Sequence, residues 1–249
     1  MARSVIITSF LEYPVDIRAL LKPDDYIVCL DGGYDIALAQ GIRPDLLLGD
    51  FDSVSADLPA GEDANGIEIR RYPPEKDYTD LELAFRVLDP GKTPELLVIG
   101  GLGGRLDQTA INLQMLARYT AVPAAEPEPG EKTDAAPGAD AEPRYARIEI
   151  LDGRSRCFAV HGDPALPPEV RTQYRIPAEA GCYLSLLPIG GDCCGVSLQG
   201  VKYPLDQAVL RWGASLGTSN EFREHEAVLS LESGCLLVIT TRGNQADRI

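Results

Sequence analysis

The first 120 residues alternate between two hydrophobic periods, and this alternation constrains the fold more than any other feature. Short apolar runs, each long enough for one buried strand, read SVIITSF, YIVCL, DLLLG and ELLVIG. Between them lie segments whose apolar residues recur every three to four positions, as on one face of a helix. Two helical stripes are predicted, formed by Leu81, Ala84, Phe85 and Leu88 and by Leu106, Ala110, Leu113 and Ala117. Strands that alternate with helices predict a mostly parallel α/β sheet.

The composition changes after this region. Residues 121–146 are rich in Pro, Ala, Glu and Gly, and such a segment buries too little apolar surface to offset its ordering entropy. We therefore expect a flexible insertion or linker. The remainder consists of short strand-like runs and turns without a strong amphipathic helix, which favours a β-sandwich or barrel. The predicted domains are 1–152, including the insertion, and 153–249.

Charge and composition exclude several classes of function. The chain of 249 residues has a formal net charge of −15, from Asp+Glu 38 against Lys+Arg 23, so a nucleic-acid partner is disfavoured. An acidic protein that handles phosphates needs a divalent cation to bridge the two. The chain has 6 cysteines but no C-x-x-C pair, and it has only 2 histidines. The sequence therefore provides little support for a disulfide framework, a zinc site or a histidine-based triad.

The sequence also predicts a cytoplasmic protein. The opening MARSVIITSF has no long apolar region followed by a small-residue cleavage site, and it is typical of a first strand. No run approaches the roughly 18 apolar residues that a membrane span requires.

Acidic residues and glycines follow the predicted strands of the first half. In an open α/β sheet, ligands bind outside the carboxyl ends of the strands. Asp31 follows one strand and precedes Gly32 and Gly33, whereas Asp50 and Asp52 follow another. A third strand ends in the loop GGLGGR, and the segment PPEKDYTD precedes a helix.

Asp50 and Asp52 are two residues apart, and in an extended segment their side chains would point to one side. Two adjacent carboxylates repel each other unless a cation lies between them. Mg²⁺ takes one or two carboxylates together with substrate phosphates, so the pair indicates half of a magnesium site. The alternative is that both aspartates bond their own backbone in a turn.

Helix capping offers a structural alternative for other polar residues. Thr79 with Glu82 fits a capping box, Asp80 suits the first turn of a helix, and Asp107 fits an N-cap. The glycine-rich loop lacks the Gly-Lys-Ser/Thr ending of a Walker A loop and the spacing of a dinucleotide fingerprint. Followed by Arg105 and a helix, it would nevertheless let the backbone approach a phosphate closely.

Taken together, these segments resemble the thiamine pyrophosphokinase family. PDLLLGDFDSV, KDYTDLELA and GGLGGRLDQTAINL are similar to the nucleotide-binding half of that family, in the same order, and GVKYPL and LGTSNEF are similar to its thiamine-binding half. The similarity covers most of the chain except residues 121–146. It implies an N-terminal Rossmann-like parallel-sheet domain, a C-terminal β-sandwich domain, and a homodimer with its sites at the subunit interface.

The resemblance also implies an activity, which is transfer of the pyrophosphoryl group of ATP to the hydroxyl of thiamine, giving thiamine diphosphate and AMP with Mg²⁺. By position in the motifs, Asp50, Asp52 and Asp80 would hold the metal, and Asp31 beside them would help activate the hydroxyl. ATP would contact Gly32, Gly33, Lys76, Asp77, Thr79, Gly103, Gly104, Arg105, Asp107 and Gln108. Thiamine would contact Thr218, Ser219, Asn220 and Phe222.

The chain departs from the family pattern in two places. Many relatives carry histidine where this chain has Gln108, and the acidic insertion is not part of the pattern. Two other functions stay open, namely a pterin-alcohol pyrophosphokinase with a similar nucleotide half and a thiamine- or nucleotide-binding sensor without turnover. The alternative for GTSNEF is a polar turn between strands in which Phe222 fills the sandwich core.

Overall fold

The computed structural model describes residues 3–59, 66–122 and 142–243. The chain divides into two compact units, one formed by 1–119 and 143–156 and the other by 120–142 and 157–249. The core of the predicted insertion, 123–141, lies outside the described residues. Its expected end at 146 is wrong, because Tyr145 is fully buried and its hydroxyl donates to the carbonyl oxygens of Phe85 and Leu88.

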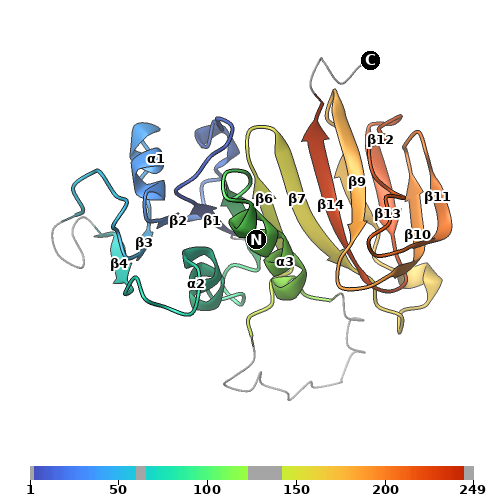
Figure 1. The fold of residues 1–249 in the computed structure, drawn as a ribbon, viewed down its shortest axis with the longest axis horizontal. Coiled ribbons are helices and arrows are strands. Elements are labelled where there is room, and N and C mark those ends of the chain that lie inside the picture. Colours follow the sequence, from blue (N-terminus) through green and yellow to red (C-terminus); the bar gives the residue numbers. More distant parts are fainter. Residues whose placement is uncertain (1–2, 60–65, 123–141, 244–249) are drawn as a thin grey trace. The chain divides into compact units, whose positions relative to one another are not determined.

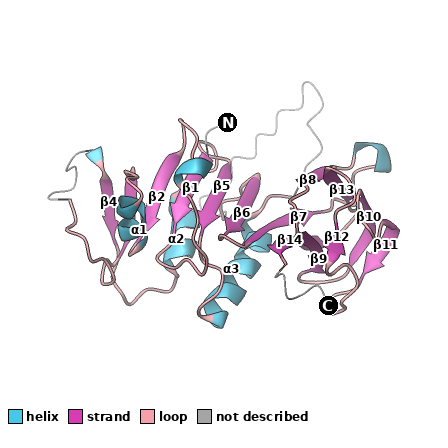
Figure 2. Cartoon of the chain, turned by 90° about the horizontal axis from the view of Figure 1, so that it is seen from above, coloured by secondary structure: helices cyan, strands magenta, loops and turns pink. Residues whose placement is uncertain are grey.

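The first unit contains a parallel sheet with the strand order β6-β5-β1-β2-β3-β4 (Figures 1 and 2). Its strands are β1 (Arg3–Ile7), β2 (Tyr26–Leu30), β3 (Leu46–Gly49), β4 (Glu68–Arg71), β5 (Glu95–Ile99) and β6 (Arg147–Leu151). Each neighbouring pair runs parallel. The central strands are apolar on both faces, as expected where helices or loops cover a parallel sheet on each side.

Helices of this unit are α1 (Gly33–Ala39), α2 (Asp80–Val87) and α3 (Leu106–Tyr119), with the short 3-10 helix η1 (Arg18–Leu20). Tyr34 and Ala37 of α1 share a hydrophobic core with Val5 and Ile7 of β1. The stripe predicted for α2 is confirmed, because Leu81, Ala84, Phe85 and Leu88 are all buried.

The stripe predicted for α3 is wrong, although the helix itself is present. The buried residues of α3 are Asn112, Met115, Leu116 and Tyr119. Leu106 is instead 81% exposed. Apolar residues occur around most of this helix, so their spacing alone does not identify the side that the body of the unit covers.

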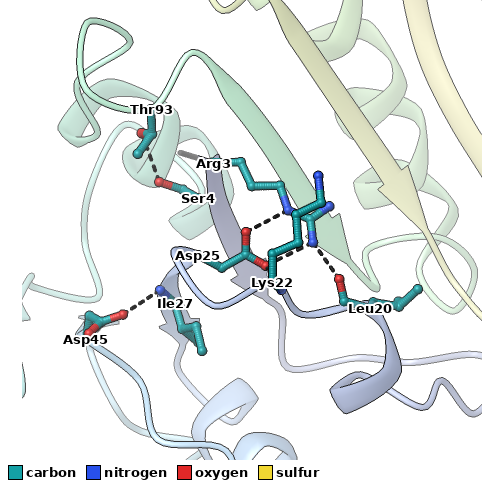
Figure 3. A network of polar contacts seen from close by, with 8 residues as sticks. All are labelled: Arg3, Ser4, Leu20, Lys22, Asp25, Ile27, Asp45 and Thr93. Carbon is teal, nitrogen blue, oxygen red and sulfur yellow. Dashed lines mark hydrogen bonds and ion pairs between the residues drawn. The ribbon is translucent and has the colours of Figure 1, made fainter. Parts of the chain in front are cut away.

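A polar network ties β1 and β2 to the loops at one end of the sheet (Figure 3). Arg3 Nε and a terminal guanidinium nitrogen lie 2.8 Å and 2.9 Å from the two carboxylate oxygens of Asp25, and the same guanidinium donates to the carbonyl oxygen of Leu20. Ser4 Oγ and Thr93 Oγ1 are 3.0 Å apart in the interior. These contacts fix the end of the sheet opposite the strand ends predicted to carry function.

The second unit is a β-sandwich. One layer of the sandwich is formed by strands in the order β12-β9-β14-β7, and the other layer is the sheet β11-β10-β13-β8. Its strands are β7 (Ser155–His161), β8 (Tyr174–Pro177), β9 (Cys182–Pro188), β10 (Cys193–Gln199), β11 (Leu205–Leu210), β12 (Asn220–Glu221), β13 (Glu226–Ser230) and β14 (Cys235–Arg242). Strand β9 alternates buried and half-buried residues, so Leu184 and Leu186 share a core with Leu198 and Leu229 from the other sheet.

Figure 2 shows that the described residues of the second unit form strands and loops, with the short 3-10 helix η3 (Pro168–Val170). The predicted fold class, a parallel α/β domain followed by a β-sandwich, is confirmed. Among the described residues, no helix has the length and apolar character needed to cross a membrane.

Candidate active site

Asp31 and Asp50 lie at the carboxyl ends of neighbouring strands. Asp31 follows β2 and Asp50 follows β3, and these two strands pair in parallel. The carboxylate of Asp31 turns toward β3, where its Oδ1 accepts a hydrogen bond of 3.0 Å from the Phe51 N–H. Gly49 makes this possible, because a Cβ at that position would lie 1.8 Å from Asp31 Oδ1. The predicted placement of both aspartates at strand ends is therefore confirmed.

Asp80 reaches the same place from the first turn of α2. Thr79 is the N-cap of this helix, and its Oγ1 accepts a 3.2 Å bond from the Glu82 N–H, as the capping pattern predicts. Lys76 Nζ lies 2.8 Å from Asp80 Oδ1, with the two side chains 13% and 27% exposed. The helix cap thus positions a carboxylate that itself takes no part in capping.

These side chains line one cavity of about 690 Å³ in the first unit. The predicted site residues on its wall are Asp31, Asp50, Lys76, Thr79, Asp80, Gly103, Gly104, Arg105 and Gln108. Residues that the sequence analysis missed are Thr8, Ser9, Phe10, Pro74, Tyr78 and Asn112. Thr8 and Ser9 directly follow β1, so the rule of polar strand ends, applied to the first strand as well, would have found them. Phe10 is apolar and gives no such signal.

Other predicted residues do not line this cavity. Gly32 and Gly33 form the start of α1, where Gly32 is the N-cap. Asp52, Asp77 and Asp107 are also not among the residues on its wall.

The expectation that Asp50 and Asp52 share one face of an extended segment is wrong. Phe51 between them has a φ of 64°, so the chain turns and the two-residue alternation of a strand does not apply. The Asp52 N–H donates a 3.1 Å bond to Asp50 Oδ1, and Asp52 itself is exposed. The turn alternative weighed for this pair therefore describes the local geometry.

The cavity concentrates negative charge. Burial raises the pKa of Asp31 to about 6, an effect that the Phe51 N–H opposes and that the nearby carboxylates of Asp80 and Asp50 reinforce. Burial lowers the pKa of Lys76, but the neighbouring Asp80, Asp50 and Asp31 carboxylates outweigh it and raise that pKa above its usual value. A cationic ligand would relieve the repulsion among these carboxylates.

The chemistry of this group fits a magnesium ion. Asp80 Oδ1 is buried, and the cation beside it is Lys76, whose Nζ lies 2.8 Å away. Within the described ranges, no group of three or more His, Cys, Asp or Glu side chains is arranged to hold a metal on its own. Two carboxylates completed by phosphate oxygens are nevertheless the usual ligands of Mg²⁺, so Asp50 and Asp80 fit the ion when a nucleotide is present.

The glycine-rich loop also lines the cavity. Asn112 Nδ2 donates a 2.8 Å bond to the carbonyl oxygen of Gly101, and Thr109 Oγ1 bonds the carbonyl oxygen of Gly103. Helix α3 therefore holds the loop through two side chains in its first two turns. Arg105 pairs with Asp107 at 2.6 Å, and both side chains are largely exposed, so the guanidinium can exchange this partner for a phosphate at little cost.

The second unit has a smaller cavity of about 170 Å³, which includes two of the residues predicted for thiamine. Its wall is formed by Tyr203, Leu205, Ser215, Leu216, Gly217, Thr218 and Asn220. Asn220 is 4% exposed, and its side-chain amide bonds both the N–H and the carbonyl oxygen of Tyr203. Asn220 thus fixes the backbone of Tyr203, whose own ring is 60% exposed.

Ser219 and Phe222 do not line this smaller cavity. The Ser219 N–H donates to Ser185 Oγ. Phe222 is half-buried and packs against the hydrophobic core of the sandwich, as the alternative for GTSNEF proposed. Tyr203 and Leu216, which the sequence analysis did not single out as site residues, are instead the large exposed side chains at this cavity.

Comparison with known proteins gives matches in both units. Residues 17–124 match the family model described as the thiamin pyrophosphokinase catalytic domain, and residues 173–236 match the thiamin pyrophosphokinase vitamin B1 binding domain. Together these ranges make up more than half of the chain. Thiamine pyrophosphokinase of Bacillus subtilis is 28% identical over 213 residues, which are 84% of this chain and 84% of the relative.

Other relatives and solved structures agree. Thiamin pyrophosphokinase 1 of Caenorhabditis elegans is 26% identical over 203 residues, covering 79% of this chain and 70% of the relative. The crystal structure of thiamin pyrophosphokinase from Geobacillus thermodenitrificans superposes with a TM-score of 0.71 at 26% identity, covering 98% of this chain and 99% of that one. The Bacillus subtilis structure gives 0.74 at 22% identity, covering 98% and 100%. The chain therefore belongs to the thiamine pyrophosphokinase family.

Proposed function

We propose that this enzyme transfers the pyrophosphoryl group of ATP to the hydroxyl of thiamine in a magnesium-dependent reaction. The observation that carries the proposal is the single cavity that joins Asp31, Asp50 and Asp80 with Lys76 and the glycine-rich loop. Family matches for both a catalytic and a vitamin B1 binding domain support the same activity. Phosphoryl-type transfer depends mainly on positioning and neutralisation of charge, and these residues supply both.

In the proposed reaction, the hydroxyl oxygen of thiamine forms a bond to the β-phosphorus of ATP. The bond between that phosphorus and the oxygen bridging to the α-phosphorus breaks, AMP leaves with the electron pair, and the hydroxyl loses its proton. When bound, Mg²⁺ would neutralise charge at the phosphates, and Asp50 and Asp80 would hold it, with Asp52 as a further predicted ligand. Asp31 accepts the hydroxyl proton, whereas Lys76 and the loop amides orient the phosphates.

Thiamine binding belongs to the second unit under this proposal. The ring of Tyr203 is exposed beside a cavity that Thr218 and Asn220 also line, and an aromatic face attracts a cation such as the thiazolium by about 0.5–2 kcal/mol. The net charge of −15 also favours a cationic substrate. The roles predicted for Ser219 and Phe222 stay predictions, and Phe222 would act through the packing of the sandwich.

A homodimer with its sites at the subunit interface completes the proposal. Support comes from the family resemblance and from the chemistry, because the thiamine hydroxyl must approach the attacked phosphorus to within about 3–3.5 Å. A cytoplasmic location likewise remains a prediction.

The decisive test is a coupled assay for AMP with purified protein, Mg·ATP and one acceptor at a time. We expect AMP to form in equal amount to thiamine diphosphate when thiamine is present, and little AMP with a pterin alcohol or with no acceptor. AMP formed with the pterin alcohol alone would favour a pterin pyrophosphokinase. Thiamine or nucleotide binding without AMP would favour a sensor.

A further inference from the structure

Phe10 is a large aromatic residue that the structure holds, half-exposed, at the wall of the nucleotide cavity. It follows β1, lines the cavity and is 43% exposed. Its backbone carbonyl oxygen accepts hydrogen bonds from the Gly101 N–H and from Thr8 Oγ1, each 3.2 Å long. The backbone of this residue is therefore fixed by the glycine-rich loop and by the residue that follows its own strand.

The ring of Phe10 packs on the backbone of the same loop. A Cβ at Gly104, where φ is +60°, would lie 2.8 Å from Phe10 Cζ and 2.9 Å from the adjacent ring carbon. The loop is held close by Glu12, whose carboxylate accepts a 3.2 Å bond from the Gly104 N–H. The tip of the ring thus packs against the glycine-rich loop, and Phe10 is among the residues that line the cavity.

We infer that Phe10 is the stacking platform for the nucleobase of ATP, an assignment that rests on the proposed function. The charged residues of the cavity, which are Asp31, Asp50, Lys76 and Asp80, suit the metal and the phosphates. Phe10 carries no charge and offers an apolar π-face, and such a surface suits a planar aromatic group. The other aromatic substrate, thiamine, is assigned to the second unit by the match over residues 173–236.

Stacking on an aromatic side chain is tolerant of the base, because every base has a π-face. Alanine substitution of such a platform weakens binding by about 5- to 150-fold. Two results are therefore expected if Phe10 stacks on the base. Phe10 must contribute to the binding of ATP and of GTP alike, and it must contribute nothing to a triphosphate that lacks a base.

The test measures dissociation constants by calorimetry in the presence of Mg²⁺ and without thiamine. The ligands are α,β-methylene-ATP, in which the scissile oxygen is replaced, its guanine counterpart, and inorganic tripolyphosphate. For Phe10→Ala we expect about 5- to 150-fold weaker binding of both nucleotides and unchanged binding of tripolyphosphate. Phe10→Trp should bind the nucleotides at least as well as the wild type, and Phe10→Leu should resemble Phe10→Ala.

Tyr13→Ala is the matched control. Tyr13 is an exposed aromatic of the same segment at 38%, but its ring contacts Arg154 and does not line the cavity. This variant should bind all three ligands as the wild type does. Circular dichroism and the Tm of every variant show whether the fold is retained.

Three outcomes would overturn the inference, namely equal weakening of nucleotides and tripolyphosphate in Phe10→Ala, no weakening of either, or full nucleotide binding by Phe10→Leu. A raised KM for thiamine with unchanged nucleotide binding would also overturn it, and would assign the ring to the other substrate. Failure of the proposed function looks different, because the wild-type protein would then form no AMP from ATP and thiamine while these binding constants are still measurable.

Discussion

At the scale of single residues, the two aspartates of GDFDS occupy different environments. Asp50 lines the cavity, whereas Asp52 is exposed outside it. We expect Asp50→Asn to lose nearly all AMP formation, because the amide keeps the shape but removes the charge that Mg²⁺ needs. Its Oδ1 can still accept the Asp52 N–H, so the fold should be retained.

The same variant gives a readout besides activity. Added Mg²⁺ with tripolyphosphate should raise the Tm of the wild type, since a ligand that binds only the folded state stabilises it, and the rise should be much smaller for Asp50→Asn. A Tm response equal to that of the wild type would contradict the metal role of Asp50. Asp52→Asn tests the metal role predicted for its neighbour, which a retained response would contradict.

The positions of some site residues could be predicted from the sequence, whereas the local backbone around them could not. The strand-end rule placed Asp31 and Asp50 because a parallel sheet brings the ends of β2 and β3 together. It could not reveal that Phe51, a residue that rarely takes a positive φ, turns the chain before Asp52. A motif likewise could not show that Phe222 packs against the sandwich core, whereas Tyr203 is exposed beside the cavity.

At the scale of elements, the N-cap of α2 affects both the stability of this helix and the position of a site residue, Asp80. The helix has only eight residues, Asp80–Val87, and its first turn carries Asp80. Replacing an N-cap threonine by alanine costs about 1 kcal/mol. We expect Thr79→Ala to lower the Tm and to reduce kcat/KM by weakening the placement of Asp80, and Thr79→Ser to preserve both. Normal stability and activity in Thr79→Ala would show that the cap contributes nothing to the site.

Helices α2 and α3 differ in how well their sequences predicted which face is buried. In α2 the predicted stripe is buried, so period identified most of the buried face, although Leu83, which lies off that stripe, is buried as well. In α3 they are spread around the helix, and the buried side includes Asn112, whose amide bonds the glycine-rich loop. A polar residue in that position carries no hydrophobic signal, so its burial follows only from the tertiary structure.

At the scale of the whole molecule, the Arg3–Asp25 pair predicts how the fold responds to acid (Figure 3). Burial raises the pKa of Asp25, but the bonds from Arg3 and the Lys22 N–H outweigh it, so the pKa lies below its usual value. The pair therefore contributes stability above about pH 4, the pKa of an unfolded aspartate, and loses it as pH falls through the lower folded value.

Asp25→Asn tests this contribution. We expect the variant to be less stable than the wild type by about 2 kcal/mol at pH 5–7, with a constant difference in Tm across that range. Below about pH 4 the difference should shrink, because the wild type loses the same interaction. A difference in Tm that stays constant down to pH 3 would show that packing, not charge, accounts for the effect.

The last prediction concerns the proposed dimer and whether two chains share each site. Asp50 lies in the catalytic unit and Tyr203 in the sandwich, so each can be disabled separately. Asp50→Asn removes the metal ligand. Tyr203→Lys places a like charge beside the thiamine cation at an exposed position, and it avoids the core contacts that make Phe222 an unsuitable choice. Each variant alone should be nearly inactive at low thiamine concentration.

If one subunit's Tyr203 faces the other's Asp50, mixing the two variants should restore activity, because a mixed dimer then has one site free of both changes. If each site lies within one chain, every site carries one change and no activity returns. Differently tagged variants, purified together as a mixed species, make the comparison independent of the rate of exchange. An inactive mixed dimer would contradict shared sites, and a single species of monomer mass in sedimentation would contradict the dimer itself.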